Sequence, residues 1–313
     1  MRRAPGAAFI AIVLAALWIS AASSAHAERY AVDYNFFSGI PAELIDHGGS
    51  LPGSNDWSCR PSAEHPNPVV LAHGTGGGAQ TNWGVYVPLL ADEGYCVYSL
   101  TYGAYGLPWP LSAVGGMLPM EQGAAQFGAF VDRVLAATGA SRVDVVGHSQ
   151  GTVVPNYYAK RLGGADKIDK YVSIAPAWRG TNAGGAGEIA AYADRLGLGP
   201  AFEATVGSLC RACVQLLQGS PFLTQLNSDG VYAPTITYTN IVTAYDEIVV
   251  PYTSGFVPGP NATNIVVQDG CALDYSDHLA IAGSPRAARY VLNALDPSHS
   301  RDVGCEFVPP FTG

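Results

Sequence analysis

The sequence predicts an α/β fold with a mostly parallel, doubly wound sheet, and three observations lead to this prediction. Short apolar segments typical of strands alternate with segments typical of helices, as in a parallel sheet covered on both faces. One such strand, Val143–Val146, runs directly into a Gly-x-Ser-x-Gly turn followed by a helical pattern. Residues 28–313 suffice for one large domain with a sizeable core.

The first 27 residues have the features of an export signal. A basic start, residues 1–3, precedes an apolar stretch, residues 7–19, and the small-x-small site Ala25-His26-Ala27. The apolar stretch is shorter than the roughly 20 residues that a bilayer requires, which disfavours a permanent membrane anchor. We therefore expect a signal peptide, cleavage near Ala27 and a secreted protein.

The composition is acidic, with few charged side chains. The formal net charge is −9, and charged residues make up 13% of the chain, about half of the usual share. Because no basic run follows the leader, nucleic acids and anionic membranes are disfavoured as partners. We expect a monomer whose partner is its substrate.

Six cysteines follow the leader, and an even number in an exported chain favours disulfides. The order of the predicted elements suggests the pairs Cys59–Cys96, Cys210–Cys213 and Cys271–Cys305, although other pairings remain open. Redox chemistry at Cys210-x-x-Cys213 is disfavoured because nothing nearby resembles a thioredoxin unit. Zinc is disfavoured because no second ligand pair accompanies these cysteines.

The predicted elements follow in order along the chain. Residues 28–66 are rich in Gly, Pro and Ser and are expected to be loops. Strands are predicted at 69–72, 95–100, 143–146, 168–175, 235–243 and 264–267, and helices at 121–138, 152–162 and 279–295.

Residues 187–226 interrupt this alternation. They contain two helix-like segments, 188–196 and 202–217, between predicted strands. The segment is either a crossover enlarged for packing or a helical cap over a functional site. Its apolar side chains suit both interpretations: Leu216, Leu217, Phe222 and Leu223.

Ser149 is the candidate nucleophile in Gly147-His148-Ser149-Gln150-Gly151. The two glycines allow a sharp strand-to-helix turn in which larger side chains would clash. A serine hydroxyl needs a base to remove its proton, and it must be presented to the substrate. A plain Gly-rich turn is the alternative, but the strand before it and the helix after it favour the nucleophile.

His278 is the candidate base. In a doubly wound hydrolase the order along the chain is Ser, then Asp or Glu, then His, and only His278 and His299 follow Ser149. His278 precedes the predicted helix 279–295 at the carboxyl edge of the sheet, where ligands bind. His299 follows that helix and is expected on the wrong side.

Asp246 is the candidate acid because it directly follows the predicted strand 235–243. It would accept a hydrogen bond from the imidazole, fix the tautomer and stabilise the imidazolium. Glu247, one residue on, and Asp277, next to the candidate base, are the weaker alternatives.

The loop His73-Gly74-Thr75-Gly76-Gly77-Gly78 is expected to help hold a developing oxyanion. The donors would be the N–H of Gln150 and the N–H of Thr75, and the Thr75 hydroxyl could also donate. A phosphate-binding P-loop is excluded because no Gly-Lys-[Ser/Thr] element follows. A Ser–Lys dyad is also excluded because no Ser-x-x-Lys motif is present.

Five motifs together resemble the secreted bacterial class 2 triacylglycerol lipases and, more distantly, Candida antarctica lipase B. The resemblance extends from about Pro68 to Cys305. The motifs are His73-Gly74-Thr75-Gly76-Gly77, Gly147-His148-Ser149-Gln150-Gly151, Ala175-Pro176-Ala177-Trp178-Arg179-Gly180-Thr181, Tyr245-Asp246-Glu247-Ile248-Val249 and Asp277-His278.

This resemblance implies the α/β-hydrolase fold and a catalytic triad of Ser149, Asp246 and His278. It also implies oxyanion donors at Thr75 and Gln150, and disulfides Cys59–Cys96 and Cys271–Cys305. The chain departs from lipase B in having His148 before the serine and Ala177-Trp178 after its Ala-Pro. Lipase B preferences for chain length and alcohol are therefore not carried over, and Cys210–Cys213 is additional to its pattern.

The expected function is hydrolysis of carboxylic esters, with triacylglycerols favoured, through an acyl-enzyme and without cofactor or metal. A carboxylesterase or polyester hydrolase on the same fold is the alternative. A non-catalytic binding module is disfavoured because neither the triad nor the oxyanion loop is broken. Action at a lipid–water interface is expected because Leu216, Leu217 and Phe222 fall in the predicted cap.

Overall fold

The computed structural model describes Met1 and residues 30–183 and 199–310. The expected cleavage site at Ala27 and the predicted helix 188–196 lie outside the described residues. Across the described ranges, no helix combines the length and the apolar character needed to cross a membrane.

Six parallel strands form one sheet in the order β2-β1-β3-β4-β5-β6. Every residue of β1, β2 and β3 is buried, as expected when both faces of a parallel sheet are covered. The strand bounds are β1 Val69–Ala72, β2 Val97–Ser99, β3 Val143–His148, β4 Ile168–Ile174, β5 Thr237–Val242 and β6 Ala262–Val266. The predicted doubly wound parallel sheet is confirmed.

The strand order reverses direction between β1 and β3. From β1 the chain first adds β2 on one side and then crosses to add β3 on the other. Loops that leave the carboxyl ends of two such strands diverge and open a crevice where ligands bind. The loop that begins at His73 and the turn that contains Ser149 both lie at this point.

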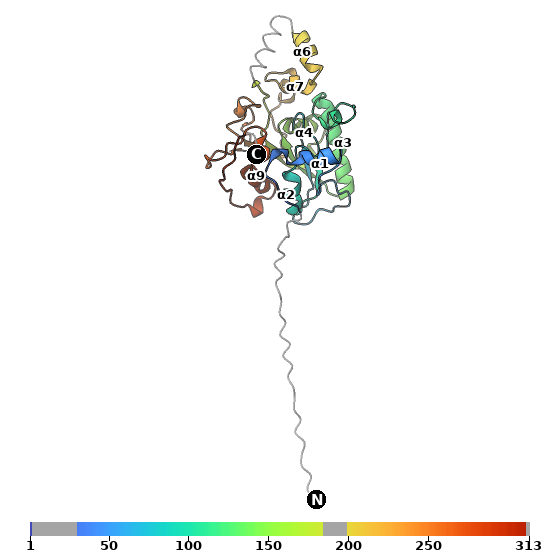
Figure 1. Ribbon diagram of the computed structural model, residues 1–313, viewed down its shortest axis with the longest axis vertical. Coiled ribbons are helices and arrows are strands. Elements are labelled where there is room, and N and C mark those ends of the chain that lie inside the picture. The colour runs from blue at the N-terminus through green and yellow to red at the C-terminus, as the bar shows by residue number, and fades with distance from the viewer. Residues whose placement is uncertain (2–29, 184–198, 311–313) are drawn as a thin grey trace.

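Helices cover both faces of the sheet with separate apolar cores. One core contains α3, Met120–Thr138, and α4, Gln150–Arg161, and the other contains α2, Tyr86–Asp92, and α9, Pro285–Leu295. Figure 1 shows α3 and α9 on opposite sides of the molecule. Burying one Val, Leu or Phe side chain contributes about 1.5–3 kcal/mol, so these two layers hold the sheet rigid beneath the site.

Residues 30–66 are not only loops, contrary to the sequence expectation. They contain a 3₁₀ helix, η1 Phe36–Gly39, and a short α-helix, α1 Ile40–Ile45. A Cβ on Gly39 would lie 2.1 Å from the carbonyl oxygen of Gln80, so this segment packs directly against the main chain of the core. A hydrophobic pattern six residues long is too short to predict such a helix.

The last helix begins at Pro285 instead of near residue 279. The Ser284 hydroxyl accepts a hydrogen bond from the N–H of Ala287, which caps the helix, and proline lacks the N–H that an interior position requires. Residues Ala280–Ala282 form a separate 3₁₀ turn, η6. His278 therefore lies in irregular chain well before the helix.

The predicted helix 202–217 is divided in two. Helix α6, Gly199–Gly207, is followed by α7, Arg211–Gln215, and then by α8, Pro221–Leu226. Cys210 caps α7 by accepting a hydrogen bond from the N–H of Cys213 through its sulfur atom. Helices α6 and α7 lie at one end of the molecule (Figure 1), with α7 joined to Met117, whose carbonyl accepts from the first two N–H groups of α7.

Three disulfides join segments around the sheet. The pairs are Cys59–Cys96, Cys210–Cys213 and Cys271–Cys305, the same three that the order of the elements suggests. The first and last close loops of 37 and 34 residues, and the second lies within the α6–α8 segment.

Candidate active site

Ser149 lies in a strained turn between β3 and α4. Its φ of 55° and ψ of −123° are rarely adopted by residues other than glycine. A Cβ on Gly147 would lie 2.2 Å from the carbonyl oxygen of Gly151, and one on Gly151 would lie 1.8 Å from that of Ala72. The two glycines are therefore required for the close approach of strand, turn and helix that exposes the serine hydroxyl to the cavity.

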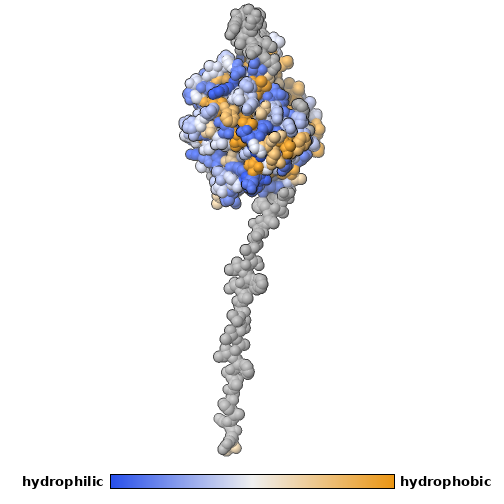
Figure 2. All heavy atoms as spheres, turned by 90° about the vertical axis from the view of Figure 1, so that its left-hand side faces the viewer, coloured by the Kyte–Doolittle hydropathy of each residue, from blue (hydrophilic) through white to orange (hydrophobic). Residues whose placement is uncertain are grey.

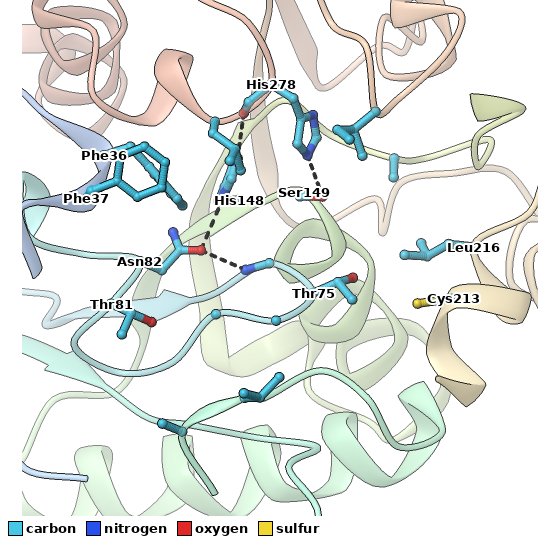
Figure 3. A pocket seen from close by; sticks show the side chains of 18 of the residues that line it. Phe36, Phe37, Thr75, Thr81, Asn82, His148, Ser149, Cys213, Leu216 and His278 are labelled. Atoms are coloured by element: carbon cyan, nitrogen blue, oxygen red, sulfur yellow. Dashed lines mark hydrogen bonds between the residues drawn. The ribbon is translucent and has the colours of Figure 1, made fainter. Parts of the chain in front are cut away.

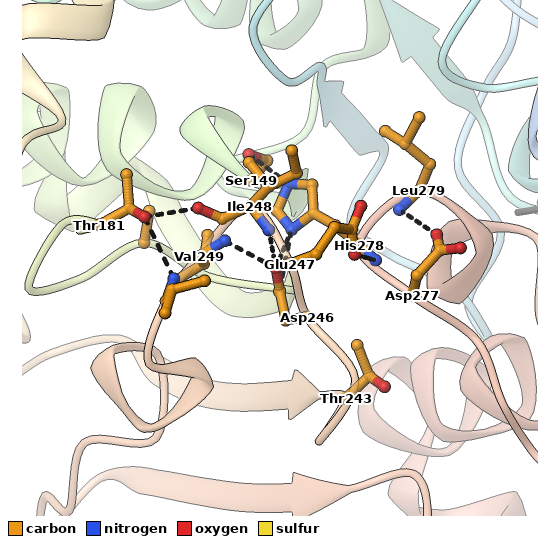
Figure 4. Close-up of polar contacts among 12 residues, drawn as sticks. Ser149, Thr181, Thr243, Asp246, Glu247, Ile248, Val249, Asp277, His278 and Leu279 are labelled. Atoms are coloured by element: carbon orange, nitrogen blue, oxygen red, sulfur yellow. Dashed lines mark hydrogen bonds and ion pairs between the residues drawn. The ribbon is translucent and has the colours of Figure 1, made fainter. Parts of the chain in front are cut away.

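A continuous chain of hydrogen bonds joins Ser149, His278 and Asp246 (Figure 4). His278 Nε2 lies 2.8 Å from Ser149 Oγ, and His278 Nδ1 lies 2.8 and 2.9 Å from the two carboxylate oxygens of Asp246. A carboxylate only accepts, so Nδ1 carries the proton and Nε2 is left free to accept from the serine hydroxyl. The side chains of His278 and Asp246 are only 3% and 2% exposed, which shields this arrangement from water.

Main-chain donors fix the carboxylate of Asp246. Its Oδ1 accepts hydrogen bonds from the N–H groups of Ile248, at 3.0 Å, and Val249, at 2.6 Å. The chain therefore turns around the carboxylate directly after β5 and aims it at the imidazole. Glu247, the weaker candidate for the acid, contacts the main-chain N–H of His278 and not its ring.

The other two alternative residues lie away from the ring of His278. Asp277 Oδ1 accepts from the N–H groups of Leu279 and Ala280 and caps the following turn. His299 is exposed and pairs with Asp296 at 2.8 Å. Neither contributes to the chain of hydrogen bonds that ends at Ser149.

The loop after β1 runs beside Ser149. A Cβ on Gly74 would lie 3.2 Å from the Cβ of Ser149, so the loop and the serine are close neighbours. Within the described part of the chain, no hydrogen bond occupies the N–H of Thr75 or of Gln150. Both groups are free to donate to an oxygen atom bound next to Ser149.

Buried side chains hold this loop in place. His73 Nδ1 donates to the carbonyl of Gly74 at 2.8 Å, and its Nε2 accepts from the N–H of Tyr102 at 3.1 Å. Burial lowers the pKa of His73 to about 4, so the ring is neutral and one tautomer serves both contacts. Asn82 Oδ1 accepts from the N–H of Gly74 at 3.1 Å and holds the start of the loop.

The serine opens into a largely apolar cavity of about 710 Å³. Figure 3 shows Phe36 and Phe37 on one side of the site and Leu216 with Cys213 on the opposite side. The first pair comes from η1, in a region that the sequence predicts to be loops, and the second from the α6–α8 segment. The cavity accommodates an apolar group on either side of the serine.

Composition alone could not identify the N-terminal wall of this cavity. Phe36, Phe37, Ile40 and Leu44 line it although they precede the first strand. The only signal for them in the sequence is a short run of apolar residues between Asn35 and Asp46. No cluster of His, Cys, Asp or Glu suited to a metal ion occurs in the residues described by the structure.

The profile of the family described as Lipase (class 2) matches residues 66–290. A curated relative, the pyrrolizixenacetamide deacetylase of Xenorhabdus hominickii, is 38% identical over 89 residues, which are 28% of this chain. The match spans less than a third of that relative, at 29% of its length.

Two solved structures share the fold. Aspergillus fumigatus lipase B superposes with a TM-score of 0.56 and 17% identity, covering 83% of this chain and 62% of that protein. The mature form of the Bacillus licheniformis lipase BlEst2 superposes with a TM-score of 0.51 and 12% identity, covering 79% of this chain and 96% of that one. The chain therefore has the α/β-hydrolase fold.

Proposed function

The chain belongs to the class 2 lipase family, and from this premise we propose that it hydrolyses carboxylic esters with a triad of Ser149, His278 and Asp246. The observation that carries the proposal is the unbroken chain of hydrogen bonds from Asp246 through His278 to Ser149, which ends at the wall of an apolar cavity. This chain of contacts supports the proposal, because acyl transfer by a serine requires a nucleophile, a base and an orienting acid in hydrogen-bond contact.

The mechanism has two halves. Ser149 Oγ attacks the ester carbonyl while His278 Nε2 removes its proton, and the same histidine then protonates the leaving alcohol. Asp246 stabilises the imidazolium formed between these steps. The resulting acyl-enzyme is hydrolysed by a water molecule that His278 deprotonates, which releases the acid and restores the serine.

Negative charge on the carbonyl oxygen is stabilised by the N–H groups of Thr75 and Gln150. Their hydrogen-bonding capacity is unused by the described residues, and the loop that contains Thr75 is fixed by His73 and Asn82. Donors that are already oriented stabilise the transition state without reorganisation, and one such donor contributes about 10²–10³-fold in rate.

The function is tested by hydrolysis of p-nitrophenyl esters from C2 to C16 by the wild-type and Ser149→Ala proteins. In a comparable triad, removal of the serine costs roughly 10⁶-fold in kcat, so the variant is expected to be inactive at every chain length. Equal activity of the two proteins would refute the triad. A wild-type optimum at long chains indicates a lipase, and one at C2–C4 indicates a carboxylesterase.

Acyl lipids such as triacylglycerols are the substrates that we favour. The cavity is lined mainly by apolar side chains, and four of those on its N-terminal side are exposed: Phe37, Ile40, Leu44 and Trp109. We call these four, with the adjacent exposed Ile45, Leu107 and Leu111, the apolar rim. Figure 2 shows one face of the molecular surface, on which apolar residues form patches among polar ones.

The apolar rim replaces the α6–α8 segment as the surface expected to meet a lipid–water interface. Of the three residues expected at the interface, Leu216 and Phe222 are each only 8% exposed, and Leu216 and Leu217 line the cavity. Leu216 and Phe222 therefore offer little apolar surface to a lipid. Ile45 and Leu44, by contrast, are 86% and 58% exposed.

A carboxylesterase acting on small esters is the second candidate. The relative named a deacetylase matches 89 residues of this chain and favours a short acyl group. A polyester hydrolase on the same fold is a further alternative, which activity on a polymeric ester would distinguish. A non-catalytic binding module would leave the intact triad without a role.

We propose that the protein is secreted as a monomer after cleavage near Ala27. All six cysteines are paired in disulfides, which persist in oxidising compartments outside the cytoplasm. The chemistry requires neither a cofactor nor a metal ion.

A further inference from the structure

His278 is contacted at its main chain as well as at its ring. We propose that Glu247 and His148 are positioning residues that hold the N–H and the C=O of His278 from opposite sides and thereby keep Nε2 aligned with Ser149. This inference rests on the proposed function, because it concerns how the base of that reaction is held.

Glu247 holds the amino side. Its Oε2 accepts a hydrogen bond from the N–H of His278 at 3.1 Å, while the preceding residue, Asp246, binds the ring of the same histidine (Figure 4). The carboxylates of two consecutive residues in the turn after β5 thus accept hydrogen bonds from one residue of another loop. Glu247 is exposed, unlike the buried carboxylate of Asp246.

His148 holds the carbonyl side. Its Nε2 lies 3.0 Å from the carbonyl oxygen of His278, and its Nδ1 lies 3.3 Å from Asn82 Oδ1 (Figure 3). Burial, assisted by the neighbouring His278, lowers the pKa of His148 to about 3, so the ring carries one proton near neutral pH. Both oxygens can only accept, so the single proton serves one of them, and we place it on Nε2, which makes the shorter contact and donates to the carbonyl.

Main-chain hydrogen bonds of a helix or strand do not fix the position of His278, so these two side chains are needed. Within the described ranges, its N–H and C=O form no main-chain hydrogen bond, because the residue lies between β6 and η6 in irregular chain. A buried main-chain group without a partner costs free energy, so the loop would rearrange to satisfy both groups elsewhere. A shift of about 1 Å at the base can cost 10²-fold in rate.

Four titratable side chains lie around His278. Asp246 contacts its ring, Glu247 its N–H and His148 its C=O, while the carboxylate of Asp277 is turned to the N–H groups of the next turn. Glu247 is therefore the charge that can be removed without touching the ring contact. Its loss would leave the imidazolium less stabilised, which moves the acidic limb of the kcat/KM profile to lower pH.

The first test compares Glu247→Gln with Glu247→Ala on p-nitrophenyl butyrate. Glutamine still accepts from the N–H of His278 but carries no charge, so kcat at the optimum is expected within about 3-fold of wild type, with the acidic limb displaced to lower pH. Alanine removes the contact as well, and kcat is expected to fall about 10-fold with an unchanged KM. Wild-type kcat in Glu247→Ala, or an unmoved acidic limb in both variants, would overturn the role of Glu247.

The second test compares His148→Leu with His148→Gln. Leucine removes the donor to the His278 carbonyl and is expected to lower kcat by about 10- to 100-fold with little change in KM, whereas glutamine restores part of the loss through its amide N–H. His299→Leu, which removes an exposed histidine far from the cavity, is the matched control with wild-type kinetics. Equal kcat in His148→Leu and wild type would overturn the role of His148.

The outcomes separate this inference from the proposed function. Activity in Ser149→Ala refutes the triad whatever the other variants do. Activity that depends on Ser149 but is unaffected in both Glu247→Ala and His148→Leu keeps the triad and refutes the positioning residues. If His148→Leu does not fold, the pH profiles of the two Glu247 variants decide the proposal alone.

Discussion

The polar centre of the site and the walls of its cavity are held by different kinds of interaction. Around Ser149, His278 and Asp246 each contact is a hydrogen bond with a defined length and direction, supported by further donors from fixed loops. The walls at Phe36–Leu44 and Leu216 consist mainly of packed apolar side chains, and Glu43, which accepts from Gln80 Nε2, is an exception among them. The hydrogen bonds of the centre therefore determine which reaction the site can perform. The shape of the cavity walls determines which substrates fit.

Apart from removal of the nucleophile in Ser149→Ala, the largest loss of kcat is expected from breaking the polar centre at Asp246. In Asp246→Asn the amide N–H₂ faces Nδ1 of His278 and favours the tautomer with its proton on Nε2, which cannot accept from Ser149. We expect kcat to fall by about 10⁴-fold with p-nitrophenyl butyrate. A loss below 10-fold would mean that Asp246 does not set the tautomer.

A change of pH is expected to have an intermediate effect, which falls on the stability of the fold. The cause is that the polar centre contains buried neutral histidines, whereas the walls do not. Burial lowers the pKa of His73 to about 4 and of His148 to about 3, whereas an unfolded chain binds these protons below about pH 6.5. The unfolded state therefore gains protons first on acidification. The stabilisation from the two neutral rings is full above about pH 6.5, and each ring's share falls by about 2 kcal/mol by pH 5.

The measurement is the urea midpoint at pH 7, 6 and 5. Asp144 supplies the control, because burial raises its pKa to about 6 and the folded state then binds a proton that the unfolded state does not. Its contribution opposes that of the two histidines, so Asp144→Asn is expected to steepen the loss on acidification. A midpoint independent of pH would contradict the neutral, buried state of both rings.

Substitutions in the cavity walls and the apolar rim are expected to have the smallest effect on the rate of hydrolysis. Replacing two exposed residues of the apolar rim in Leu44→Ser/Ile45→Ser removes apolar surface without touching a hydrogen bond of the centre. The rate on a soluble short ester is expected to be unchanged, and the rate on emulsified tributyrin about 5-fold lower, because less apolar area is buried at the interface.

The control for the rim is Leu162→Ser. Leu162 is 46% exposed at the far end of α4, so its replacement is expected to leave both rates unchanged. Wild-type specific activity that does not rise as tributyrin passes from solution to emulsion would contradict action at an interface, whatever the variants show.

The sequence predicted the polar centre better than the walls for a physical reason. Ser149 was recognisable because its turn needs glycines on both sides, and Asp246 because it directly follows a strand. These requirements are local and leave a pattern in the chain. The strand order at β1 and β3 then places the two loops together, as parallel topology demands.

The residues that form the cavity walls show no comparable local pattern in the sequence. Helix α1 is six residues long and depends on packing of Gly39 against Gln80, and the break between α6 and α7 depends on the Cys210 cap. The sequence likewise offered Glu247 as a rival acid, since it cannot show which of two adjacent carboxylates turns toward the ring. That choice is made by the two main-chain N–H groups that bind Asp246.

The most direct test of the account is covalent labelling with a fluorophosphonate, followed by peptide mass spectrometry of the intact, disulfide-bonded protein. A single adduct on Ser149, formed in parallel with the loss of esterase activity and absent from Ser149→Ala, is the predicted result. An active protein that forms no adduct, or one labelled at another residue, would contradict the assignment of Ser149 as the nucleophile.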